Sequence, residues 1–126
     1  MLILLLVTDM SEGFWGSCSL PKQDIIMSLN STDFREDGCN IHADTLPGGP
    51  FANVNLGFTA VHEAGHWLGL LHVFQGFACD GEGDLIDDTP VTQTDSVGCP
   101  TGKDSCPDGP GLDPIHNFMD YSDDSW

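Results

Sequence analysis

The chain has 126 residues, which suits one small domain or part of a larger one, and 40% apolar residues are enough for a hydrophobic core. Its 20 acidic residues against three basic ones give a net charge of −17, which argues against a nucleic-acid partner because phosphate contacts need Lys and Arg. An acidic surface suits cation binding and the steering of basic substrates, although a well-solvated secreted protein would also have one.

The first elements expected along the chain are short strands. The apolar run at residues 2–7 predicts a central strand covered on both faces. It lacks a basic region before it and a clean cleavage site after it, so we interpret it as neither a signal peptide nor a membrane span. Further strands are expected at residues 15–20, as an edge strand, at 24–30 and at 39–44. No segment is apolar and long enough to cross a bilayer.

A helix is expected next, because apolar residues recur with helical spacing after a Pro- and Gly-rich loop at residues 46–50. It should begin between residues 56 and 59 and end near residue 70. Within it stands the sequence HEAGHWLGLLH, residues 62–72. That spacing carries most of the functional argument.

Two histidines of this stretch, His62 and His66, are one helical turn apart and can bind one metal ion. Glu63 is placed to take a proton from the water that the metal activates. Gly69 can adopt a positive φ and end the helix, which lets His72 return to the same ion. Three nitrogens and one water form the open site of a catalytic zinc, whereas the alternative is an amphipathic helix that contains histidines by chance.

The stretch at residues 76–114 is rich in Gly, Asp, Pro, Ser and Thr and shows no periodic segment. Such a long irregular stretch needs disulfides or a bound cation to hold it. Hard oxygen ligands for calcium are offered by Asp80, Asp84, Asp87, Asp88 and Thr89, although a solvated acidic loop has the same composition.

Five cysteines in a small acidic chain indicate an oxidising compartment, and the sequon at Asn30 agrees with one. No CxxC pair occurs, so their spacing matches no zinc ribbon. The odd number leaves at least one thiol without an internal partner. Cys18 and Cys39 are near enough in the chain to pair with each other.

The longer pattern HExxHxxGxxH, together with a downstream methionine in the sequence NFMDY at residues 117–121, resembles the metzincin metalloproteases. The amino-acid sequence around these motifs is similar to that of the pappalysin (cytophagalysin) family, and nearest to its secreted fungal members. The similar segments are residues 62–76, 83–90, 98–106 and 111–121. They lie within a strong resemblance over residues 46–125, and a weaker resemblance extends back to Met1.

The resemblance implies an α+β, zincin-like fold in which a small mixed sheet packs on the active-site helix. An irregular C-terminal subdomain follows, stabilised by disulfides and calcium and containing a methionine turn. We therefore expect one partial catalytic domain over residues 1–126, with the sheet and helix in 1–72 and the irregular part in 73–126. Family catalytic domains extend beyond both ends of this chain.

The resemblance also assigns roles to single residues. Met119 would lie beneath the three histidines as an apolar floor, and the Tyr121 phenol would hydrogen-bond the oxyanion of the reaction. Relatives bind calcium in the region that corresponds to Gly83–Thr89. The edge strand would pair with the substrate backbone.

The family disulfide pattern implies a bond between Cys79 and Cys106. It also leaves Cys99 without its partner, since Trp126 stands where relatives have a cysteine.

These observations together predict a secreted, extracellular and monomeric zinc endopeptidase that acts on proteins or peptides, with calcium as a second candidate cofactor. Neither nucleic acid nor membrane is expected as a partner. The alternative is a truncated or inactive metal-binding remnant of such a protease, although the intact Glu63 favours the enzyme because a structural zinc site would not need that carboxylate.

Overall fold

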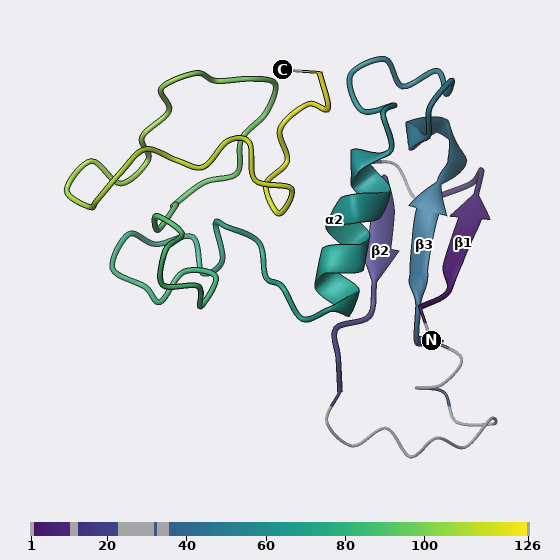
Figure 1. The fold of residues 1–126 in the computed structure, drawn as a ribbon, viewed down its shortest axis with the longest axis horizontal. Coiled ribbons are helices and arrows are strands. Elements are labelled where there is room, and N and C mark those ends of the chain that lie inside the picture. Colours follow the sequence, from purple (N-terminus) through teal and green to yellow (C-terminus); the bar gives the residue numbers. More distant parts are fainter. Residues whose placement is uncertain (1, 11–12, 23–31, 33–35, 126) are drawn as a thin grey trace. The chain divides into compact units, whose positions relative to one another are not determined.

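The structure is a computed structural model that describes residues 2–10, 13–22, 32 and 36–125. They form two compact units, Met1–Gly69 and Leu70–Trp126, which we call the first and the second unit. Figure 1 shows that the regular elements lie in the first unit and that the second consists of loops. The strand expected at residues 24–30 falls outside the described residues.

The first unit contains a mixed three-stranded sheet in the order β1-β3-β2 (Figure 1). Strand β1 (Leu4–Val7) runs parallel to β3 (Cys39–His42), and β2 (Gly16–Cys18) runs antiparallel to β3. Residues alternate in exposure along β3, which buries Cys39 and Ile41 while Asn40 is exposed. One face of the central strand therefore belongs to the core.

The prediction that residues 2–7 form the central strand was wrong, because β1 is an edge strand of the described sheet. Its side chains Leu4, Leu5 and Leu6 are 45%, 55% and 60% exposed. A continuous apolar run favours a strand but does not fix the number of its neighbours. The prediction of an edge strand at residues 15–20 agrees with β2, which is shorter.

After β3 the chain forms the 3₁₀ helix η1 (Ala43–Thr45). The Nδ1 atom of His42 accepts a hydrogen bond from the Asp44 N–H at 3.2 Å, so this imidazole caps η1. Helix α2 (Phe58–Trp67) begins within the predicted range and packs against β2 and β3. Among the described residues no helix has the length and apolar character needed to span a membrane.

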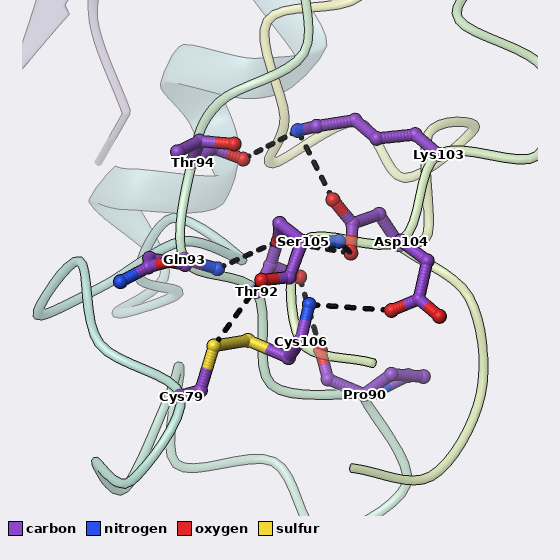
Figure 2. Close-up of a disulfide and its surroundings, with 10 residues drawn as sticks. Cys79, Pro90, Thr92, Gln93, Thr94, Lys103, Asp104, Ser105 and Cys106 are labelled. Atoms are coloured by element: carbon purple, nitrogen blue, oxygen red, sulfur yellow. Dashed lines mark hydrogen bonds and ion pairs between the residues drawn. A yellow bond between two sulfur atoms is a disulfide. The ribbon is translucent and has the colours of Figure 1, made fainter. Parts of the chain in front are cut away.

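The second unit has no helix or strand among its described residues, as its composition predicts. A disulfide between Cys79 and Cys106 crosses it, and this is the pair that the family resemblance implied (Figure 2). The bond joins residues 27 apart in sequence, which is worth about 3 to 4 kcal/mol in the chain-entropy model. Cys99 is a free, exposed cysteine, and in the first unit Cys18 pairs with Cys39.

Lys103 connects several loops of the second unit through its ammonium group. It donates hydrogen bonds to the carbonyl oxygens of Thr94 and Asp95 at 2.6 and 2.8 Å and forms an ion pair with Asp113 at 3.1 Å. The other Asp113 oxygen accepts from the Ser105 backbone N–H and hydroxyl at 2.9 and 3.0 Å. Figure 2 shows the hydrogen bond from Lys103 to Thr94 in the same view as the disulfide. Such side-chain contacts replace the backbone ladders that the unit lacks.

Candidate metal centre and active site

Helix α2 carries the first part of the site. Gly57 precedes it at φ 91° and makes no side-chain capping bond. Because the helix packs on β2 and β3, it buries His62 and Glu63 within one turn. The ring centroids of His62 and His66 are 4.7 Å apart in an edge-to-face arrangement, so both imidazoles occupy the same side of the helix.

The chain leaves this helix through Gly69, as predicted. Its N–H donates to the His66 carbonyl oxygen at 2.9 Å, and its φ of 97° is one that residues with a side chain rarely adopt. A Cβ atom added to Gly69 would not clash, because the nearest atom, Cγ of Pro21, would lie 3.5 Å away. Backbone conformation is therefore what requires glycine at this position.

Across the stretch from His62 to His72 the three imidazoles come together. Each ring offers one nitrogen, and these atoms all lie within 4.8 Å of one another. No other group of three or more His, Cys, Asp or Glu side chains in the described part of the chain has such an arrangement. Three neutral imidazoles with room for a water are the donor set of a catalytic zinc ion.

Glu63 is the acidic side chain of this site, and it is only 6% exposed. Burial raises the pKa of its carboxyl group from 4.5 to about 7, because desolvation disfavours the ionised form. Its Oε2 atom is buried and has no hydrogen-bond partner among the described residues. A buried carboxylate oxygen needs a polar partner, and the described residues do not supply one for this atom. A pKa near neutrality suits a general base.

Tyr121 lies against His72 in the second unit. Its hydroxyl oxygen is 3.0 Å from Nε2 of His72, and the two rings meet edge to face at 5.0 Å. Phe74 stacks on the imidazole with ring centroids 4.8 Å apart and an interplanar angle of 8°, and it also meets the Tyr121 ring edge to face at 5.0 Å. Asp120 fixes the backbone of Tyr121, because its Oδ1 atom accepts a hydrogen bond from the Tyr121 N–H at 2.8 Å. No motif or spacing in the sequence indicated this role of Asp120.

Met119 is buried in a small cluster with Val73 and Phe74. The Val73 N–H donates to the Met119 carbonyl oxygen at 3.2 Å, and the Met119 N–H donates to Oδ1 of Asn117 at 2.9 Å. The methionine thus packs against the residues that follow His72 in the chain. Its role as the floor of the three histidines stays a prediction.

The residues proposed to bind calcium lie in loops of the second unit. Asp84 is buried and accepts from the Ile86 N–H at 3.1 Å, and it lines a cavity of about 420 Å³ together with Asp88 and Thr89. Asp87 is not part of that lining. The three carboxylates do not form a ligand cluster in the described structure, so calcium binding remains a prediction without support from their arrangement.

One neighbour of the site was not expected from the sequence. Gly16 of β2 faces the Glu63 side chain so closely that a Cβ atom there would overlap it. The two residues lie far apart in the chain, and a lone glycine in a short strand carries no signal that would connect them.

Comparison with known proteins gives three concordant results. A family profile described as pregnancy-associated plasma protein-A, a peptidase family, matches residues 50–125. Extracellular metalloproteases of Pyricularia oryzae and Neurospora crassa are 53% and 52% identical to the chain over 122 residues, which is 97% of this chain and 41% of each relative. The chain therefore spans about two fifths of the length of these curated relatives.

A solved structure of mature mirolysin from Tannerella forsythia, in complex with a cleaved peptide, is similar with a TM-score of 0.77 at 28% identity. The match covers 98% of this chain and 45% of mirolysin. The fold described above is therefore the mirolysin-like metzincin fold.

Proposed function

Since the chain belongs to the peptidase family of pregnancy-associated plasma protein-A, the pappalysins, we propose that it hydrolyses peptide bonds as a zinc-dependent endopeptidase. The observation that carries this proposal is the combination of three clustered imidazoles with a buried, partnerless carboxylate oxygen one residue from the first of them. A structural zinc site would have no use for that carboxylate.

His62, His66 and His72 are the residues that would hold the ion. When bound, zinc supplies Lewis-acid polarisation of the scissile carbonyl and lowers the pKa of water. Glu63 accepts a proton from the attacking water while the water oxygen bonds to the carbonyl carbon. It then delivers that proton to the amine nitrogen as the C–N bond breaks.

Tyr121 is the proposed second catalytic residue. Its hydroxyl group, now beside His72, is a hydrogen-bond donor for the carbonyl oxygen as that oxygen gains negative charge. The short distance between the Tyr121 hydroxyl oxygen and His72 supports this role, because a group close to a proposed zinc ligand is also close to the scissile peptide bond. The edge strand β2 is proposed to pair with the backbone of the substrate.

The substrate class and the location follow from the relatives. The mirolysin complex contains a cleaved peptide, and the fungal relatives are named extracellular metalloproteases. We propose that this chain likewise acts outside the cell, on proteins or peptides, as a monomer. Two disulfides agree with an oxidising compartment.

The decisive experiment compares the zinc-loaded chain with its Glu63→Gln variant in a casein assay. Glutamine keeps the shape of the side chain but cannot accept the proton, so we expect one zinc per chain and almost no cleavage. Glu82→Gln removes the same charge at an exposed position and should retain the parent rate. Cleavage by Glu63→Gln at the parent rate would show that Glu63 is not the base.

The same assay tests the alternative function. If the parent chain binds zinc in a 1:1 ratio but cleaves no casein or gelatin, it is a metal-binding remnant of a protease. We retain this alternative because the chain spans about two fifths of the length of these relatives.

A further inference from the structure

Gly16 lies in strand β2, where its missing side chain leaves the space that Glu63 occupies. A Cβ atom built on Gly16 would lie 2.5 Å from both Cγ and Oε1 of Glu63 and 2.8 Å from Cδ. Carbon atoms in contact are normally 3.5 to 4.0 Å apart, so no larger residue fits while Glu63 keeps its position. Steric exclusion therefore couples these two residues.

The backbone gives no other reason for glycine at this position. Gly16 is absent from the residues with positive φ, so alanine can adopt its conformation. Glycine weakens the interior of a strand, because it adds backbone entropy to the unfolded chain and contributes no packing. Taken alone, Gly16→Ala should thus stabilise β2.

Strand β2 is also fixed in place and cannot withdraw to make room. Gly16 pairs with the fully buried Ile41, and Cys18 pairs in register with Cys39, to which it is also joined by a disulfide. The sulfur of Cys39 lies 3.5 Å from the carbonyl oxygen of Glu63, so the cross-linked strands contact the backbone of this residue as well. An added methyl group would consequently displace the carboxylate rather than the strand.

We propose that Gly16 is a positioning residue for Glu63. Its bare Cα forms one wall of the slot that holds the carboxylate, and the Cys18–Cys39 disulfide keeps that wall in register. The inference rests on the proposed role of Glu63 as the base. It adds to the proposed site a residue that is distant in the chain and that acts there by having no side chain.

The first test is kinetic and uses the full zinc-loaded chain. Gly16→Ala should lower kcat by about 10²-fold, the loss that a misplacement of about 1 Å can cause, while zinc content stays at one per chain and KM changes little. Asn40→Ala, which alters an exposed side chain on the neighbouring β3, should keep the parent kcat. A parent-like kcat in Gly16→Ala would overturn the proposal.

The second test measures thermal midpoints and does not depend on activity. Gly16→Ala should lower the midpoint of the parent chain but raise that of the Glu63→Ala variant, in which the slot is empty. A rise in both backgrounds would overturn the inference. If Gly16→Ala alone does not fold, recovery of folding in the double variant supports it, and failure of the double variant as well contradicts it.

The two tests separate this inference from the proposed function. If the parent chain shows no peptidase activity, the proposed function fails, and the reversal of sign between the two thermal measurements still decides whether Gly16 makes room for Glu63.

Discussion

His72 differs from the other two histidines because it lies outside α2 and depends on the turn at Gly69. It is also the imidazole that contacts Tyr121 and stacks on Phe74, so its orientation is fixed by residues of the second unit. Removing it therefore tests the three-nitrogen site without disturbing the helical pair.

We expect His72→Ala to weaken zinc binding by more than about 100-fold, beyond the 10- to 100-fold typical of losing an outer-shell partner of a ligand. Competition with a chromogenic chelator measures this. His116→Ala serves as the control, because that exposed histidine is not part of the cluster. Equal zinc affinity in His72→Ala and in the parent chain would contradict the assignment of three histidines.

The residues of this site were predictable to very different degrees. The helical spacing of His62 and His66 and the positive φ of Gly69 follow from local geometry, which sequence reports directly. The contact of Gly16 with Glu63 depends on how a distant strand packs on the helix. Spacing along the chain contains no information about such a contact.

At the level of the elements, α2 and β2 could be predicted because each has a local signal, whereas the place of β1 in the sheet could not. Neighbour relations in a sheet are set by packing between distant segments. In the second unit, composition predicted the lack of regular structure. The Lys103 network was not predictable, because a single lysine in an acidic chain also fits a solvated surface.

Lys103→Met should lower the free energy of unfolding of the second unit by about 3 to 5 kcal/mol. The variant leaves the Asp113 carboxylate, whose side chain is 2% exposed, without its cation, and it removes donors to the Thr94 and Asp95 carbonyl oxygens. Urea unfolding followed by near-UV circular dichroism measures the loss. Glu82→Gln, which removes a charge at an exposed position, should change stability by less than about 0.5 kcal/mol.

If Lys103→Met and Glu82→Gln unfold at the same urea concentration, the ion pair between Lys103 and Asp113 is only a surface contact.

For the whole molecule, the net charge of −17 is the property that dominates long-range interactions. Electrostatic attraction of a cationic substrate raises its association rate and weakens with ionic strength. We expect kcat/KM for a lysine-rich peptide to fall as salt rises from about 0.01 to 0.15 M, over which the Debye length shrinks from about 30 to 8 Å. A peptide with the same scissile sequence and neutral flanks is the control. Identical salt dependence for the two peptides would show that the charge serves solubility alone.

The two units hold themselves together by different means, and this determines how each can be observed. The described part of the second unit contains no helix or strand, and its loops are joined by the Cys79–Cys106 bond and by side-chain contacts to backbone groups. Its loss of structure will change the far-ultraviolet spectrum of the peptide bond very little. Helix α2 will dominate the far-ultraviolet signal. A melting curve recorded at these wavelengths will therefore follow the unfolding of the first unit and will detect almost nothing of the second.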